Sequence, residues 1–384
     1  MSIEAGIGTA VITPPTPVQL AGFAEDQPAT EVHDDLEVRV LYLGAEHGAV
    51  ALVVCDLLGL SRRFAQPVRD AVATELGVAP TAVLTSCVHT HAGPSTIEGS
   101  ERIGWPTPEG YGALLLERCL AAARAARADA APVEMRVGRW PLPAELSVNR
   151  RDLPYEPTFA VLDLLGRDGR RRGTLANIAV HPVALGPECL AVSSDWVGSF
   201  RSNLEARAGG RTVLLSGALG DVNPHHVHRQ HNDCRGDGFA EAAQLGRDLA
   251  DAVEDKLAGA APVDAAAPVV YRHRFVDVEL GATLLAAGRG GRTWTIELIE
   301  WSLGPVRLVS IPGEAFHALG RAVEDRVEHE GSFVIVAGLA PEWHGYLPMP
   351  YRDGYEESMS YGPAAVATVA AALTEPPPRS GERG

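Results

Sequence analysis

The sequence predicts an α/β fold in which helices flank a layered, mixed β-sheet, with a strand-rich C-terminal part. Two observations favour this class. Short apolar runs alternate with segments of helical periodicity along much of the chain, which is typical of layered α/β proteins, and strand-like runs become more frequent toward the C-terminus. The 384 residues, 46% of them hydrophobic, are enough to bury roughly three quarters of the surface of the unfolded chain. A folded globular protein is therefore expected.

Strands are predicted where short apolar or β-branched runs lie between Gly, Pro or polar turn positions. The runs at 36–43 and 49–54 form a hairpin that turns at 46–48. Residues 6–12 form an earlier strand, which ends because Pro14 and Pro15 follow it. The remaining strands are predicted at 82–87, 133–140, 159–165, 174–180, 212–216, 269–280, 293–301, 306–311 and 333–337.

Helices are predicted where apolar residues recur at helical spacing. The segment 62–76 has this spacing and is followed by Gly77, a residue typical of helix C-termini. The other helices are predicted at 109–128, 197–208, 239–257, 315–328 and near 364–373. No Pro- or Ser-rich linker divides the chain. Residues 1–374 are therefore expected to form one domain, and 375–384 (EPPPRSGERG) a disordered tail.

The charge and the cysteines restrict the expected partners and compartment. Lys and Arg number 33 against 49 Asp and Glu, a net charge of −16 without a basic stripe, which disfavours nucleic acid and anionic membranes and leaves a small molecule as the expected partner. No signal peptide and no apolar run of about 18 residues is recognised. The cysteines form no CxxC pair, as in reducing compartments; they are Cys55, Cys87, Cys119, Cys189 and Cys234. We expect a cytoplasmic protein, whose oligomeric state the sequence does not specify.

Polar residues that can bind metal or substrate follow five of the predicted strands. They come after 82–87, 174–180, 212–216, 306–311 and 333–337. Because the carboxyl ends of strands form the binding crevice of α/β sheets, these clusters predict one site at that edge. The residues that carry the prediction are His89, His91, His181, Asp221, Asn223, Glu314 and Tyr346.

The histidines and Glu314 each allow a functional and a structural interpretation. His89 and His91 share one face of an extended segment, so one can bind a metal while the other acts as acid, base or electrophile; the alternative is a pair of loop histidines bonded to the backbone. Pro182 restricts the backbone of His181, which is either a ligand or a buried structural histidine. Glu314 at a helix start is compatible with both ligation and dipole stabilisation.

Three aspartates at strand ends are expected beside the substrate or the ligands. Asp221 lies in the Gly-rich turn 217–224 and is expected either to orient a ligand imidazole or to cap the turn. Asp56 follows the hairpin, and Asp195 is placed to cap the next helix. A histidine-rich segment matches no standard zinc spacing and is expected to be a solvated or lid loop; it contains His225, His226, His228, His231, Asp233 and Cys234.

Taken in chain order, several motifs resemble the neutral/alkaline, non-lysosomal ceramidase family. They are GIGTAVITPP with AGFA, VCDLLGL, HTHAGP, SVNRR, IAVHP, SSDWVG, GALGDVNP, VSIPGEAFHALGR and GLAPEWHGYLPM. Because these motifs run in order from about residue 6 to residue 361, the resemblance covers nearly the whole chain. It implies a hydrolase that cleaves the amide of ceramide with one zinc ion held by two His, one Glu and one Tyr. By motif, these ligands would be His89, His181, Glu314 and Tyr346.

The resemblance also implies residues on the substrate side. His91 would lie beside the scissile carbonyl, and Arg150 of the NRR motif would match a substrate-side arginine. Tyr361 is the nearest match to a second tyrosine of the family, with imperfect spacing. One position departs from the family, because Asn223 replaces a catalytic serine; an amide can donate a hydrogen bond to an oxyanion but is not a hydroxyl.

The sequence therefore predicts a zinc-dependent amidohydrolase that acts on linear amides through a metal-activated water. His91, Asn223 and Tyr361 are expected near the oxyanion, and His91 is expected to donate a proton to the leaving amine. A short bacterial member limited to the catalytic domain is expected, because neither the C-terminal β-sandwich of the long ceramidases nor an apolar docking insertion is recognised. Two alternatives stay open. One is an esterase, lactonase or deacetylase for a small polar metabolite, and the other is a non-catalytic metal-binding homologue, which Asn223 favours.

Overall fold

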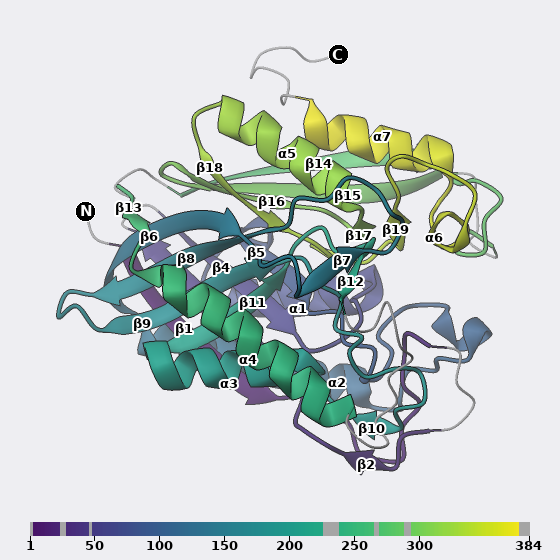
Figure 1. Ribbon diagram of the computed structural model, residues 1–384, viewed down its shortest axis with the longest axis horizontal. Coiled ribbons are helices and arrows are strands. Elements are labelled where there is room, and N and C mark those ends of the chain that lie inside the picture. The colour runs from purple at the N-terminus through teal and green to yellow at the C-terminus, as the bar shows by residue number, and fades with distance from the viewer. Residues whose placement is uncertain are drawn as a thin grey trace.

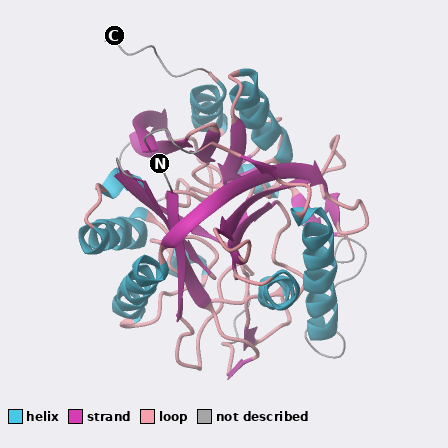
Figure 2. Ribbon diagram, turned by 90° about the vertical axis from the view of Figure 1, so that its left-hand side faces the viewer, coloured by secondary structure: helices cyan, strands magenta, loops and turns pink. Residues whose placement is uncertain are grey.

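The computed structural model describes residues 3–23, 28–45, 48–225, 238–264, 269–287 and 293–375. Two β-sheets lie face to face between outer helices, so the α/β class predicted from the sequence is confirmed (Figure 1). The view turned by 90° shows the strands stacked in the centre and the helices around them (Figure 2). The predicted turn at 46–48 lies partly outside the described residues. Residues 226–234 of the histidine-rich segment and 376–384 of the predicted tail lie outside them.

The first sheet is mixed and has nine strands within the described ranges, in the order β11-β9-β8-β6-β1-β3-β4-β5, with β13 beside β6. β3 and β4 form the expected antiparallel hairpin, whereas β4 with β5 and β9 with β11 run parallel. Its strands are β1 (Ile3–Val11), β3 (Glu37–Ala45), β4 (Gly48–Cys55), β5 (Val83–Cys87), β6 (Ala131–Pro141), β8 (Thr158–Gly166), β9 (Arg171–Ile178), β11 (Arg211–Ser216) and β13 (Ala261–Pro262).

The second sheet has four strands in the order β14-β15-β16-β18 within the described residues. It comprises β14 (Val269–Glu279), β15 (Thr293–Leu303), β16 (Val306–Ser310) and β18 (Phe333–Ala337). β16 and β18 run parallel. Alternation along the strands separates two faces: Trp301, Leu303 and Leu308 pack on the first sheet, while Leu298 and Val309 belong to the apolar cluster beneath the outer helices.

Helices cover the outer faces of both sheets. α1 and α2 pack on the first sheet through the cluster that contains Val38, Val40 and Val53, while α5 and α7 cover the second sheet. The helices are α1 (Arg62–Leu76), α2 (Tyr111–Asp129), α3 (Trp196–Ala208), α4 (Gly238–Leu257), α5 (His317–His329), α6 (Tyr355–Ser358) and α7 (Pro363–Thr374), with 3₁₀ turns at Pro80–Ala82 and Ser100–Ile103. Among the described helices, none combines the length and the apolar character needed to cross a bilayer.

Three short strand pairs lie outside the two sheets and are absent from the sequence prediction. β7 (Ser147–Asn149) pairs with β12 (Val222–Pro224), and β17 (Glu314–Ala315) pairs with β19 (Tyr346–Leu347). β2 (Glu31–Val32) pairs with β10 (Ala191–Val192). In the first two pairs, β12, β17 and β19 lie in the connections that follow β11, β16 and β18, while β7 lies between β6 and β8. These two pairs position most of the candidate site.

Asp195 caps α3 as predicted, in a strained conformation. Its φ is 60°, and its carboxylate accepts hydrogen bonds from the backbone N–H groups of Trp196 at 2.7 Å, Leu185 at 2.8 Å and Ala184 at 3.2 Å. Burial raises the pKa of Asp195 to about 7, although these donors oppose the shift. This side chain therefore connects the segment after His181 to the start of α3.

This raised pKa predicts a pH-dependent stability. Because the folded state holds the Asp195 proton at a higher pH than the unfolded chain, the contribution of Asp195 to the free energy of unfolding is full below about pH 4 and is lost as pH rises toward 7. The difference in unfolding free energy between the native protein and Asp195→Asn should therefore decrease from pH 5 to pH 8 in urea titrations. A difference that is constant with pH would contradict the assignment.

Candidate active site

Two histidines at the carboxyl ends of strands in the first sheet have the same arrangement of ring nitrogens. His89 follows β5 and His181 follows β9. The Nδ1 atom of His89 lies 2.5 Å from the carbonyl oxygen of Leu58, and that of His181 lies 3.1 Å from the carbonyl oxygen of Val222. A carbonyl can only accept, so each Nδ1 carries the proton and donates, which leaves a lone pair on each Nε2. This tautomer is the one in which histidine binds a metal through Nε2.

Glu314 faces both of these lone pairs. Its Oε2 atom lies 3.1 Å from Nε2 of His89 and 3.4 Å from Nε2 of His181, and all three atoms are buried without a hydrogen-bond partner among the described residues. Its other oxygen, Oε1, accepts a hydrogen bond from Nε1 of Trp343 at 2.9 Å.

Three buried lone-pair atoms that face one another repel unless a cation lies between them. Ligand atoms arranged tetrahedrally at about 2.0–2.1 Å from a zinc ion are about 3.3 Å from each other. The measured separations of 3.1 Å and 3.4 Å match this spacing. The residues present therefore fit a divalent ion such as zinc.

Tyr346 lies next to Glu314 because β17 and β19 pair in parallel with these two residues in register. Its hydroxyl is 3.3 Å from Nη2 of Arg150. Burial and the nearby Glu314 carboxylate raise the pKa of Tyr346 well above its ordinary value. The strand pairing thus brings the fourth predicted ligand to the same end of the molecule as the other three.

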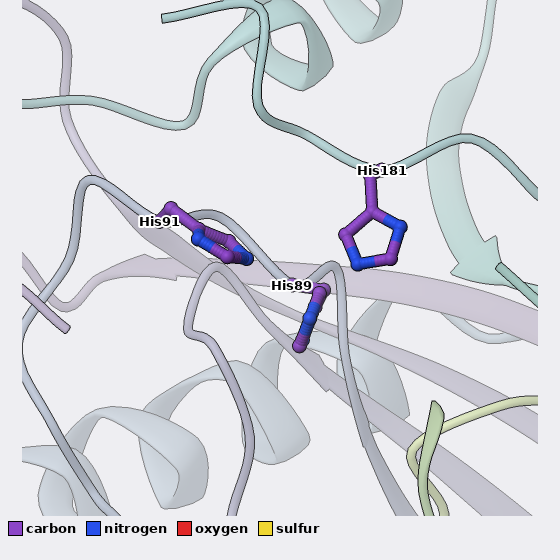
Figure 3. A group of neighbouring side chains, drawn as sticks. All are labelled: His89, His91 and His181. Atoms are coloured by element: carbon purple, nitrogen blue, oxygen red, sulfur yellow. The ribbon is translucent and has the colours of Figure 1, made fainter. Parts of the chain in front are cut away.

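His91 completes a cluster of three imidazoles with His89 and His181 (Figure 3). One ring nitrogen from each lies within 4.8 Å of the others, so the cluster also has the spacing of a three-histidine metal site. Both nitrogens of His91 lack a hydrogen-bond partner among the described residues. Burial is the main reason that the pKa of His91 lies well below its ordinary value, and it keeps the ring neutral at pH 7.

The surroundings of His91 leave little room on one side. A Cβ on Gly22, whose φ is +114°, would lie 2.4 Å from Nδ1 of His91, and the ring of Phe23 packs 4.7 Å away. Glycine at position 22 therefore lets the backbone approach the imidazole closely. Packing against Gly22 and Phe23 therefore positions His91, and no hydrogen bond from the described residues to its ring nitrogens does so.

Arg150 connects the residues on the other side of the cluster. Its Nη1 donates to Oδ1 of Asn223 at 3.2 Å, its Nη2 donates to the carbonyl of Gly220 at 2.6 Å, and its Nε donates to Glu356 at 3.0 Å. Its guanidinium also lies 5.6 Å from the centre of the Tyr346 ring. The guanidinium is therefore a fixed positive charge between Asn223 and the predicted tyrosine ligand.

The 217–224 turn packs directly on the strand that carries Glu314. A Cβ on Gly220 would lie 2.4 Å from the carbonyl oxygen of Glu314, and the Gly220 N–H donates to Ala315 at 2.7 Å. Val222 accepts the backbone N–H of His181 at 3.0 Å as well as its Nδ1. The turn therefore orients His181 and presents Asn223 next to Arg150.

The expectation that Asp221 orients a ligand imidazole is wrong, since backbone carbonyls hold both Nδ1 atoms. The Asp221 carboxylate instead accepts from Nδ2 of Asn149 at 2.6 Å and from the backbone N–H of His317 at 2.7 Å, joining the β7–β12 pair to α5. Asp56 is likewise occupied, because it accepts two hydrogen bonds from buried Arg201 at 2.7 Å and 2.6 Å. Burial raises the pKa of Asp221.

Tyr361 lies beside a second buried histidine. Its hydroxyl is 3.2 Å from Nδ1 of His344, whose Nε2 is 3.2 Å from Glu342. Arg62 donates to the same glutamate at 2.8 Å. His344 belongs to the EWHGY segment between Trp343 and Tyr346, so Tyr361 contacts the loop that follows β18.

Trp343, His344 and Glu342 are the functional candidates that the sequence reasoning missed. The signal for Trp343 is its place in the GLAPEWHGYLPM motif, but an indole in a loop gives no indication of which acceptor it binds. In the structure it orients Glu314 and contacts Gly59, since a Cβ there would lie 2.7 Å from the Trp343 side chain.

Trp343→Phe should weaken metal binding without removing it. The substitution keeps the ring but loses the N–H that orients Glu314, and losses of such outer hydrogen bonds typically cost about 10–100-fold in metal affinity. Competition with a chromophoric chelator measures this affinity. Trp301→Phe is the matched control, because it removes an indole N–H that donates to Thr81 in the core. Equal affinities for Trp343→Phe and the native protein would contradict the role.

Comparison with known proteins identifies the fold. No profile of a known protein family matches the chain, and no curated protein sequence matches it either. Among solved structures, the neutral ceramidase from Pseudomonas aeruginosa aligns with a TM-score of 0.81 at 18% identity, over 97% of this chain and 74% of that one. A ceramidase complexed with C2 aligns equally well, with a TM-score of 0.81 at 17% identity and the same coverage. This chain therefore has the fold of the neutral ceramidases, as the order of its motifs predicts.

Proposed function

We propose that the protein is a zinc-dependent hydrolase that cleaves the amide bond of an N-acyl compound. The observation that carries the proposal is the convergence of three buried lone-pair atoms, Nε2 of His89, Nε2 of His181 and Oε2 of Glu314, at tetrahedral ligand spacing. The ceramidase fold and the motif that places Tyr346 beside Glu314 support the same assignment.

His89, His181, Glu314 and Tyr346 are the residues that would hold the zinc. When bound, zinc lowers the pKa of a water ligand toward 7 and polarises the scissile carbonyl. The chain supplies the surrounding groups. His91 is neutral and has no hydrogen-bond partner for either ring nitrogen among the described residues, so it is placed to take a proton from the attacking water and pass it to the leaving amine. Arg150 fixes the carbonyl of Asn223, and this orientation leaves the Asn223 N–H₂ as the donor toward the developing oxyanion.

Arg150 contributes through its position and its permanent charge. Its contacts with Asn223 and Gly220 in one turn, and with Tyr346 in another segment, join its own segment to two distant parts of the chain. Because the fork of a guanidinium is rigid, these contacts limit the movement of the oxyanion donor relative to the ligand tyrosine. Prearranged donors of this kind stabilise charge that develops in the transition state.

We expect short, soluble N-acyl compounds to be better substrates than long-chain ceramide, because no apolar docking insertion is recognised in the sequence. The test is the release of amine or acid from a panel that contains N-acetyl to N-palmitoyl amides, matched esters and lactones, and micellar ceramide, each with zinc and with a chelator. Zinc-dependent cleavage of short amides is the expected result. Micellar ceramide outperforming every short amide would contradict the expected substrate class.

The same panel separates the remaining alternatives. Faster cleavage of esters or lactones than of the matched amides would replace the amidase proposal with an esterase or lactonase. Zinc binding without turnover of any compound would leave a metal-binding homologue, in agreement with the exchange of the family serine for Asn223.

A further inference from the structure

A cavity lies on the outer face of the second sheet, away from the candidate active site. Its volume is about 360 Å³, which is within the range of small-ligand sites. It opens between strands β14–β16, helix α5 and the C-terminal end of α7. The residues used below are Arg274, Arg326, Leu298, Val309, Ala372 and Leu373.

Strand register places the cavity on the face that the outer helices cover. Arg274 is opposite Leu298 in the β14–β15 pair, and Val309 is opposite Glu300 in the β15–β16 pair. Arg326 lies nine residues beyond His317 on α5, which corresponds to about 14 Å along a helix. Since Glu314 lies three residues before the start of α5, the cavity and the candidate metal site lie toward opposite ends of this helix.

Arg326 is a buried guanidinium with incomplete hydrogen bonding. Its side chain is 9% exposed, and Nη2 donates to Glu300 at 3.3 Å. Nη1 lies 3.5 Å from Glu330, but neither Nη1 nor Nε has a hydrogen-bond partner among the described residues. Buried N–H groups of a charged side chain are costly when they are not bonded, so this group favours an incoming acceptor.

Arg274 adds a second positive charge to the same cavity. One of its Nη atoms donates to the carbonyl oxygen of Ala372 near the end of α7. Burial and the charge of Arg326 lower the pKa of Arg274, while Glu300 and Glu375 at the same cavity oppose the shift.

The nearby carboxylates do not complete the pairing of these arginines. Glu375 also lines the cavity and acts on Arg274 through its charge, but no ion pair joins these two described residues. Glu300 is shared among Arg272 at 3.8 Å, Arg326 at 3.3 Å and Arg307 at 2.5 Å. Glu330 is shared between Arg307 and Arg326, each at 3.5 Å. One carboxylate cannot satisfy three guanidinium groups with good geometry, so the cavity retains donors for a further anion.

We propose that this cavity binds a small carboxylate that carries an apolar chain. The carboxylate would accept hydrogen bonds from Arg274 and Arg326, since the planar fork of guanidinium matches a carboxylate in two-point contact. The chain would lie on the apolar surface formed by Leu298, Val309 and Leu373. The chemistry of the cavity alone carries this proposal, which is independent of the proposed hydrolase activity, although a hydrolase of N-acyl compounds would release acids of this class.

The first test compares three probes on the full-length, metal-loaded protein. Isothermal titration calorimetry should show octanoate binding, with 1-octanol and acetate at least about tenfold weaker, because the alcohol lacks the charge and acetate lacks the chain. Equal binding of 1-octanol and octanoate would overturn the proposal, as would the absence of octanoate binding at millimolar concentration.

The second test locates the site with variants. Arg326→Gln and Arg274→Gln should each weaken octanoate binding roughly 10- to 100-fold, the loss expected for a charged hydrogen bond. Arg170→Gln is the matched control, because the Arg170 side chain is 88% exposed on another turn, and it should bind like the native protein. If one of the two cavity variants fails to fold, octanoate binding by the other variant tests the proposal. Unchanged binding in a folded cavity variant would overturn the proposal.

A third comparison separates this cavity from the metal site. His89→Ala should keep octanoate binding, because His89 does not line the cavity. Loss of binding in His89→Ala would place octanoate at the metal site and overturn the proposal. Since no arm of the experiment measures turnover, failure of the proposed hydrolase activity would leave the result unaffected.

Discussion

Replacing His89 or His181 by alanine should remove the bound zinc and with it nearly all hydrolytic activity. Each variant loses an Nε2 lone pair that faces Oε2 of Glu314, and the remaining ligands leave an incomplete site. Zinc supplies several kcal/mol of transition-state stabilisation, so turnover should fall by more than about 1,000-fold. Elemental analysis should find about one zinc per native chain and far less in the variants.

Two further variants make this prediction specific. His329→Ala removes an exposed histidine of α5 and should keep both zinc and turnover. His91→Ala should keep zinc and lose turnover if His91 faces the substrate, whereas loss of zinc would show that the three-histidine cluster is the metal site. Full zinc retention in both His89→Ala and His181→Ala would refute the ligand assignment.

Asn223→Ala should slow the chemical step about 100- to 1,000-fold while the zinc content stays unchanged. The reason is the orientation of the amide: Oδ1 accepts from Arg150, so Nδ2 is the atom available to an oxyanion. Turnover and melting temperature should be measured side by side. If Asn223 only shapes the turn, the melting temperature will fall and turnover will not.

Two further substitutions of Asn223 test whether its amide donates a hydrogen bond to the oxyanion or only holds Arg150 in place. Asn223→Ser retains a hydroxyl donor and should keep more activity than Asn223→Ala. Asn223→Asp retains an acceptor for Arg150 but has no N–H, so it should be as slow as Asn223→Ala. High activity in Asn223→Asp would instead assign to Asn223 the role of holding Arg150 in place.

The elements with strong local signals are the ones that the sequence predicts well. The helix predicted at 62–76 matches α1 because both its periodicity and Gly77, with φ of 69°, are local features. The β3–β4 hairpin follows in the same way from its alternating pattern and close connection. The β7–β12 and β17–β19 pairs are too short to show a periodicity, and their partners are distant in the chain, so nothing local indicates which segments meet.

The candidate site was predictable in its residue types and less so in its contacts. His89, His181 and Glu314 follow apolar strands, and the parallel pairs β4–β5, β9–β11 and β16–β18 bring such strand ends together. That Trp343 binds Glu314, or that Asp221 binds His317 and not an imidazole, depends on side-chain directions that arise only when both sheets are packed. Polar residues in loops have several acceptors within reach, and the sequence alone does not select one.

The four proposed ligands come from two different sheets, and this division affects how the protein would acquire zinc. His89 and His181 follow strands of the first sheet, whereas Glu314 and Tyr346 follow strands of the second. Neither sheet alone carries more than two of the four ligands, so a chain with undocked sheets would bind the ion weakly. Zinc loading would then be a late event in biogenesis, and the ion would act as a cross-link between the two layers. Because binding free energy adds to folding free energy, zinc-starved cells would hold a population with loosened layers that proteases can remove.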